Sequence, residues 1–201
     1  AISTTVWDAN RNHPGAAHYL IHAYDDPDHA PLGLPMARAY STIAPAAAHA
    51  QHMTSHIFVA LGMWGDVVTA NEIAIATETE SGSVSPMWSP TASHYPYWLL
   101  YGYTQQGRYS KARELMETAT ERMRETPNAL EKRYFIAMRA RYVIDTEDWD
   151  ATSLYVLPNG QTESDPIYRY TEAISAIHRG KLDEARADMD AMKPLAERYE
   201  T

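Results

Sequence analysis

The segment QQGRYSKARELMETA, residues Gln105–Ala119, has the pattern of a tight turn that leads into an amphipathic helix. Gly107 stands two residues before the aromatic Tyr109, and small or apolar side chains then recur every three or four positions. Glycine lets the backbone reverse between two helices, and the recurring spacing places the apolar side chains on one helix face. The segment therefore predicts the turn and second helix of a helical hairpin.

The same pattern occurs three more times along the chain. It is present in ALGMWGDVVTANEIAIA (Ala60–Ala76), with Gly62, and in HRGKLDEARADMDAM (His178–Met192), with Gly180. A degenerate copy, DTEDWDATSLY, has Glu147 in place of the glycine. The recurrence resembles that of tetratricopeptide (TPR) repeats, in which stacked helical hairpins form a solenoid. The intervals between the turn residues shorten along the chain, which predicts irregular repeats.

Helical periodicity extends over the rest of the chain, and the alternating Val/Ile/Thr runs typical of strands are nearly absent. We therefore expect an all-α fold, a TPR-like helical-hairpin solenoid of about five helix pairs. The first pair is predicted near Pro14–Tyr24 and Leu34–Ile43. We expect a single solenoid over residues 1–201, with His-rich, charge-poor repeats over 1–76, a loop over 77–93 and charge-rich repeats over 94–201.

The composition excludes several classes of protein. The formal net charge of -9 repels a nucleic-acid backbone, so no nucleic-acid partner is expected. No apolar run approaches the roughly 20 residues of a membrane-spanning helix, so membrane insertion is not expected. The chain contains no cysteine, which excludes disulfides, thiolate metal sites and cysteine nucleophiles. Only ten of the 17 basic and 26 acidic side chains lie in residues 1–104, and such a charge-poor region usually buries its surface against itself, a partner or a ligand.

Two short segments of the charge-poor region hold seven of the nine histidines. The segments are HPGAAHYLIHAYDDPDHAP (His13–Pro31) and HAQHMTSHIF (His49–Phe58). Each contains two histidines four residues apart, a spacing that puts both rings on one helix face. The first helices of successive TPR hairpins lie side by side, so we expect the two pairs to face one another. These pairs are His18 with His22 and His52 with His56.

Imidazole pairs at this spacing are a familiar chelating geometry, because both rings reach one ion without bending the helix. Nitrogen ligands of this kind suit copper, zinc, nickel or iron, and the sequence does not choose among them. Asp25 or Asp26 is expected to supply an oxygen ligand or to orient a ring through a hydrogen bond. The alternative is that the histidines bond only to one another and to nearby backbone. The candidate metal ligands are His18, His22, His52 and His56, followed by His49, His94 and Asp25.

The remaining histidines receive other interpretations. His13 precedes Pro14 and is predicted to stand at the start of a helix rather than to bind metal. His29 and His178 are predicted to have no special role. No glutamate lies between the histidines of either pair, so the zinc-protease motif H-E-x-x-H is absent. We assign no catalytic residue, and the sequence leaves open whether the protein is an enzyme.

The segment MWSPTASHYPYWLLYGY (Met87–Tyr103) is dense in aromatic side chains. His94, Trp98 and Tyr101 share a helix face, with Tyr97 nearby. One interpretation is ordinary packing of a TPR core. The other is that Trp98, Tyr101 and Tyr97 form an aromatic wall that binds a peptide, a sugar or a hydrophobic small molecule.

The stretch Asn12–Trp64 resembles a group of bacterial TPR-containing proteins. The group shares an H-P-G-x-x-H-Y-x-I-H-x-x-D block and an H-x-x-H-M-P-S-H-I-F block. Both are present here, except that Thr54 stands where the group has proline. The resemblance implies the TPR fold and the importance of the histidine blocks, and it implies no specific reaction. It also implies that this chain is the C-terminal part of a longer protein, and it favours a periplasmic or extracellular location.

Three functions are compatible with these patterns. The first is a TPR-type binding or scaffold protein with a histidine-based metal or ligand site in its concave groove. The second is a pure interaction subunit without metal, which binds a protein partner or a second copy of itself. The third is a copper or iron metalloenzyme whose ion keeps an open coordination position beside a pocket.

Overall fold

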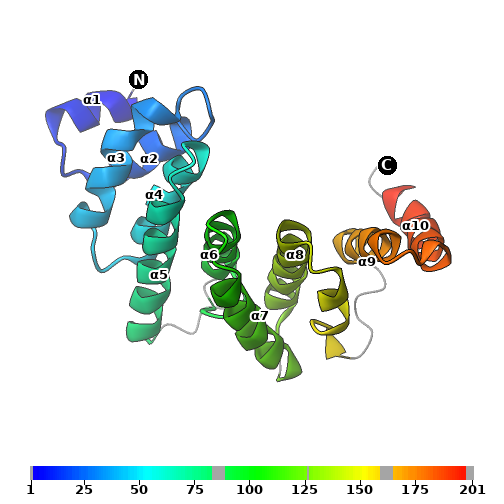
Figure 1. Cartoon of the computed structure of the whole chain (residues 1–201). Coiled ribbons are helices and arrows are strands. Elements are labelled where there is room, and N and C mark those ends of the chain that lie inside the picture. Colours follow the sequence, from blue (N-terminus) through cyan, green and yellow to red (C-terminus); the bar gives the residue numbers. More distant parts are fainter. Residues whose placement is uncertain (1, 83–88, 126, 159–164, 198–201) are drawn as a thin grey trace. The chain divides into compact units, whose positions relative to one another are not determined.

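The computed structural model describes residues 2–82, 89–125, 127–158 and 165–197 and shows an all-α protein (Figure 1). No β-strand occurs in these residues. The chain divides into two compact units, Ala1–Pro90 and Thr91–Thr201. Among the described helices, none combines the length and apolar character that a bilayer crossing requires.

The first unit is built around a central helix, α4. Helix α2 packs against both α3 and α4, while α4 also contacts α3 and α5. The core contains Ile21, Met53 and Ile57, each almost fully buried. Burial of these apolar side chains against one another is the main source of stability for such a unit. The helices of the unit are α1 (Ile2–Ala9), α2 (Pro14–Ala23), α3 (Ala30–Ile43), α4 (Ala48–Ala60) and α5 (Trp64–Glu80).

Local sequence explains where α2 begins and how closely α3 approaches α4. Pro14 occupies the first turn of α2, and Nδ1 of His13 accepts a hydrogen bond from the Ala16 N–H at 3.1 Å. This contact confirms that His13 stands at the start of the helix as a cap. In α3, a Cβ added to Gly33 would lie 2.6 Å from Cδ1 of Ile57, so glycine permits the close approach to α4.

The four predicted turn residues all adopt left-handed backbone conformations. Gly62, Gly107 and Gly180 have φ values of 68°, 67° and 73°, and Glu147 has φ of 55°. Each follows the end of a helix, where a residue in this conformation reverses the chain direction. The prediction of a turn at Glu147 is therefore confirmed, even though the usual glycine is missing there.

The second unit also consists of successive packed helices. Helix α6 contacts α7 and α8, and α8 contacts α7, η2 and α9. Helix α8 begins with a capping box in which Asn128 accepts from the Leu130 and Glu131 N–H groups. The elements are α6 (His94–Gln105), α7 (Tyr109–Arg124), α8 (Ala129–Thr146), the short 3-10 helix η2 (Trp149–Ser153), α9 (Pro166–His178) and α10 (Leu182–Glu197).

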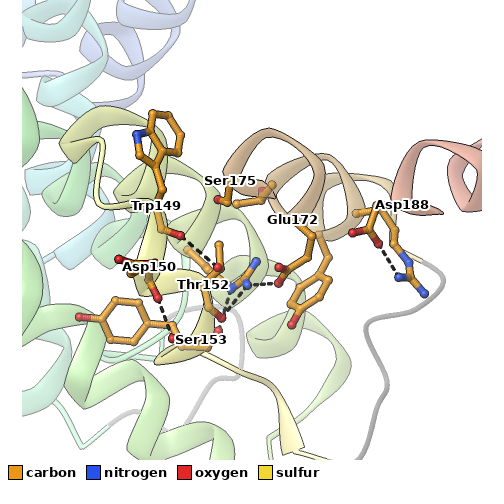
Figure 2. A network of polar contacts seen from close by, with 12 residues as sticks. Trp149, Asp150, Thr152, Ser153, Glu172, Ser175 and Asp188 are labelled. Carbon is orange, nitrogen blue, oxygen red and sulfur yellow. Dashed lines mark hydrogen bonds and ion pairs between the residues drawn. The ribbon is translucent and has the colours of Figure 1, made fainter. Parts of the chain in front are cut away.

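A buried arginine joins three elements of the second unit. Arg139 of α8 is 0% exposed and donates hydrogen bonds to the backbone oxygens of Tyr155 at 2.7 Å and Thr152 at 2.9 Å. Its guanidinium also forms an ion pair with Glu172 of α9 and lies 4.2 Å from the ring centroid of Tyr168. Figure 2 shows Glu172 beside the labelled residues of η2 in this network. Arg139 therefore holds η2 and α9 against α8.

Two predicted boundaries differ from the structure. Thr77–Glu80 belong to the end of α5 rather than to the predicted loop over 77–93, and residues 83–88 of that loop lie outside the described part of the chain. Helix α1 was not predicted, because it is short and has no turn glycine before it. The predicted first pair, near Pro14–Tyr24 and Leu34–Ile43, corresponds to α2 and α3, although α3 begins four residues earlier.

Candidate metal centre

Helix α2 presents two of the candidate ligands, His18 and His22. Their Nε2 atoms lie 3.0 Å apart and their ring centroids 4.8 Å apart. The spacing of four residues places both rings on one face of α2, as predicted from the sequence. His18 is partly buried and His22 is exposed, so the pair lies at the surface of the first unit.

Helix α4 presents three further candidate ligands, His49, His52 and His56. The His18 ring lies 5.2 Å from the His49 ring, and the His22 ring lies 6.0 Å from the His56 ring. On α4, the His52 ring is 6.3 Å from His49 and 5.1 Å from His56. The five rings therefore form a closed circuit across the contact between α2 and α4, which we call the histidine circuit.

The His52 ring is hydrogen-bonded to an asparagine of α5. His52 is fully buried, and its Nδ1 lies 2.7 Å from Oδ1 of Asn71, which is also fully buried. Asn71 is not among the residues predicted from the sequence. A signal for it exists, because Asn71 is a polar residue on the same buried face of α5 as Val67 and Ala74. A polar side chain on a core-facing stripe requires a hydrogen-bond partner.

His56 is held by a carboxylate. Its Nδ1 lies 2.7 Å from Oδ2 of Asp25, which follows the end of α2. The His56 side chain is only 13% exposed and the Asp25 side chain 32% exposed. A carboxylate that accepts from one imidazole nitrogen orients the ring and makes the other nitrogen a better metal ligand.

Asp26 has a different partner from Asp25. Its carboxylate pairs with Nδ1 of His29 at 2.8 Å, and it also accepts from the His29 backbone N–H at 3.0 Å. These hydrogen bonds lower the pKa of the Asp26 carboxyl. Of the two adjacent aspartates considered in the sequence analysis, the structure thus brings Asp25 to the histidine circuit and directs Asp26 to His29.

Two rings of the circuit, those of His18 and His49, are held toward the neutral form. Burial lowers the pKa of His18, and the nearby rings of His22 and His56 lower it further. Burial also lowers the pKa of His49, again with contributions from the neighbouring histidines. A neutral imidazole keeps the nitrogen lone pair that a metal ligand needs, whereas a protonated one does not.

Aromatic stacking fixes the orientation of His18. Its ring lies 5.7 Å from the Tyr19 ring and 5.9 Å from the Tyr40 ring, at interplanar angles of 11° and 19°. Tyr19 is exposed, while Tyr40 is nearly buried, and burial raises the pKa of the Tyr40 hydroxyl. The stacking places a buried phenol directly beside one candidate ligand.

The remaining candidates belong to the second unit. Nδ1 of His94 lies 3.3 Å from the Tyr134 hydroxyl, and its ring is 5.8 Å from the Trp98 ring. Arg141 lies 4.1 Å from the centroid of the Tyr101 ring and donates to the Tyr97 hydroxyl at 3.3 Å. The Arg141 guanidinium thus stacks on Tyr101, one of the three residues of the predicted aromatic wall.

His178, predicted to have no special role, stacks on Trp149 at a centroid distance of 3.9 Å.

The histidine circuit supplies imidazole nitrogens, which are donors that transition-metal ions prefer. Imidazole nitrogens bind such ions at about 2.0–2.1 Å, so two ligands of one ion lie about 2.9 Å apart at a right angle and about 3.3 Å apart in a tetrahedron. The 3.0 Å contact between the His18 and His22 Nε2 atoms is a hydrogen bond in the metal-free chain, and its length also lies in the range for two ligands of one ion. Comparison with protein-family models, curated proteins and solved structures finds no match to this chain.

Proposed function

We propose that the protein is a TPR-type binding protein whose first unit holds a divalent transition-metal ion in the histidine circuit. His18, His22, His52 and His56 are the principal ligands in this proposal, and His49 completes the donor set. Asp25 is not a ligand in this proposal but accepts a hydrogen bond from the His56 ring. The successive helix pairs and the left-handed turn residues support the TPR-like part of the proposal.

One observation carries the proposal. Five imidazole rings, supplied by two helices distant in sequence, converge within ring-to-ring distances of 4.8–6.3 Å in a region that is poor in charge. In the metal-free chain the contact between His18 and His22 is a hydrogen bond, and a bound cation would instead accept a lone pair from each ring.

Among the metals considered, we expect copper to bind the circuit most tightly. Cu(II) and Ni(II) prefer square-planar or tetragonal nitrogen sites, whose neighbouring ligands subtend right angles. Cu(II) also stands above the other divalent ions in intrinsic affinity for such donors. We therefore expect the order Cu(II) above Ni(II) above Zn(II).

The experiment is a titration of the full chain, purified without a nickel-affinity tag and stripped of metal. We expect one Cu(II) per chain by calorimetry and elemental analysis, with a visible ligand-field band from nitrogen coordination. His22→Ala and His56→Ala should each weaken binding at least tenfold, because each removes one ligand from a different helix. His29→Ala is the matched control, since His29 is an exposed histidine of the same unit outside the circuit.

The proposal fails if the wild-type chain binds no stoichiometric Cu(II), Ni(II) or Zn(II). It also fails if His22→Ala and His56→Ala bind as tightly as His29→Ala. In either case the circuit would not be a metal site, and the contacts among its histidines would be hydrogen bonds that hold α2 against α4.

A further inference from the structure

The amide of Asn71 has a fixed orientation. Its Nδ2 donates to the backbone oxygen of Val67 at 2.8 Å, and that oxygen can only accept. The carbonyl end of the amide, Oδ1, is therefore the atom that faces His52, at 2.7 Å from Nδ1. Because Asn71 and His52 are both fully buried, no water competes for this contact.

The fixed amide determines which nitrogen of His52 carries the proton. A carbonyl oxygen can only accept, so Nδ1 of His52 must donate and must be protonated. In a neutral imidazole the other nitrogen, Nε2, then carries the lone pair. The same reasoning applies to His56, whose Nδ1 faces the Asp25 carboxylate at 2.7 Å.

We propose that Asn71 and Asp25 are positioning residues that hold His52 and His56 as Nδ1–H tautomers, so that both rings bind the metal through Nε2. This inference rests on the proposed function for the identity of the ligand, while the tautomers themselves are a property of the metal-free chain. It adds α5, through Asn71, to the elements that build the site.

The two positioning residues differ in charge, so the Nε2 atoms of His56 and His52 differ in how strongly they donate electrons to a metal. The Asp25 carboxylate is an anion that accepts from Nδ1 of His56 and makes its Nε2 the stronger electron donor. The Asn71 amide has no charge, so it orients the His52 ring through a neutral hydrogen bond. The α4 pair thus combines one imidazole held by an anion with one held by a neutral group.

The first test reads the tautomers directly in the metal-free full chain. Two-dimensional ¹⁵N–¹H NMR distinguishes protonated from unprotonated ring nitrogens, and it is recorded at about pH 8, above the ordinary imidazole pKa of about 6.5. We expect protonated Nδ1 and unprotonated Nε2 in both His52 and His56. A dominant Nε2–H form in either ring overturns the assignment for that ring and its positioning residue.

The second test removes each positioning group. Asn71→Leu replaces the amide by an apolar side chain of similar size, and Asp25→Ala removes the carboxylate. Each variant should convert its histidine to a mixture of tautomers and lower the Cu(II) affinity about 10–100-fold. Asp25→Asn should retain the Nδ1–H tautomer of His56, because its amide oxygen still accepts, and should recover part of the affinity.

The matched control is Thr54→Val. Thr54 is a buried residue of α4 whose hydroxyl donates to the Gln51 backbone oxygen at 2.8 Å and holds no histidine ring. A purely structural role for Asn71 predicts that both variants change stability alike and that neither changes the His52 tautomer, which would overturn the proposal. If Asn71→Leu does not fold, the tautomers of the wild-type chain and the behaviour of the Asp25 variants still test the proposal.

The two proposals fail in different ways. If His52 and His56 have the Nδ1–H tautomer but the chain binds no metal, the proposed function is refuted and the positioning roles of Asn71 and Asp25 stand. Tight Cu(II) binding in a chain whose His52 has the Nε2–H tautomer refutes the positioning and leaves the metal site standing.

Discussion

Glu147 is a non-glycine residue in the left-handed backbone conformation that ends a helix. It has φ of 55° at the end of α8, in the place that glycine occupies at residues 62, 107 and 180. An L-residue with a Cβ pays a steric penalty in this region that glycine does not. Its side chain is exposed, so nothing in the packing requires glutamate there.

We therefore predict that Glu147→Gly stabilises the chain by about 0.5–1 kcal/mol. The gain comes from relief of backbone strain, and urea denaturation followed by circular dichroism measures it. The control is Gly107→Ala, which should destabilise by about 1 kcal/mol because it introduces the same strain at an equivalent turn. A loss of stability in Glu147→Gly would contradict this account of the turn.

A second residue-scale prediction concerns the buried guanidinium. Arg139→Met should destabilise the second unit by about 3 kcal/mol, because it leaves Glu172 and two backbone oxygens without their donor. Arg186→Met is the matched control, since the Arg186–Asp183 pair is exposed and should contribute little. Chemical denaturation of both variants measures the difference, and equal stabilities would show that Arg139 does not hold η2 and α9.

At the scale of elements, the contact between α2 and α4 is sensitive to acid. Burial and neighbouring rings lower the pKa of His18 and His49 in the folded chain below the ordinary value. Above about pH 6.5 both histidines are neutral in the folded and unfolded chains, so they do not affect stability there. As the pH falls below about 6.5, the unfolded chain takes up protons first, and folding becomes less favourable.

We predict that the metal-free chain loses stability between pH 7.5 and pH 5.5, values on either side of about 6.5. The double variant His18→Gln, His49→Gln should lose less over the same interval, because it lacks both groups. Thermal unfolding with a chelator present measures the slopes, and His29→Gln serves as the exposed-histidine control. If stability changes with pH equally in the double variant and the wild type, protonation of His18 and His49 does not affect folding.

At the scale of the whole molecule, the division into two compact units predicts a local response to metal. Saturating metal stabilises only the state that binds it, by about 2.7 kcal/mol when the free ion is at 100 times its dissociation constant. We expect Cu(II) to increase hydrogen-exchange protection in α2 and α4, which supply the circuit, and to leave α9 and α10 unchanged. Protection spread evenly over both units would contradict a site confined to the first one.

Much of the fold was predictable because its signals are local. Helix periodicity and the turns at Gly62, Gly107, Glu147 and Gly180 depend on residues only a few positions apart, so the pattern in the sequence predicts them directly. The end of α5 was missed because Thr77–Glu80 carry no apolar stripe, and their helical conformation continues from the preceding turns.

The candidate site was predictable only in part. The pairing of His18 with His22 follows from helix geometry, since four residues make about one turn. The choice of Asp25 over Asp26 and the contact of Asn71 with His52 span 31 and 19 residues. These contacts exist only because α2, α4 and α5 pack together and bury the polar groups where each needs a specific partner. Local periodicity thus determines the helices and the ligand spacing, and tertiary packing determines which nitrogen each ring presents.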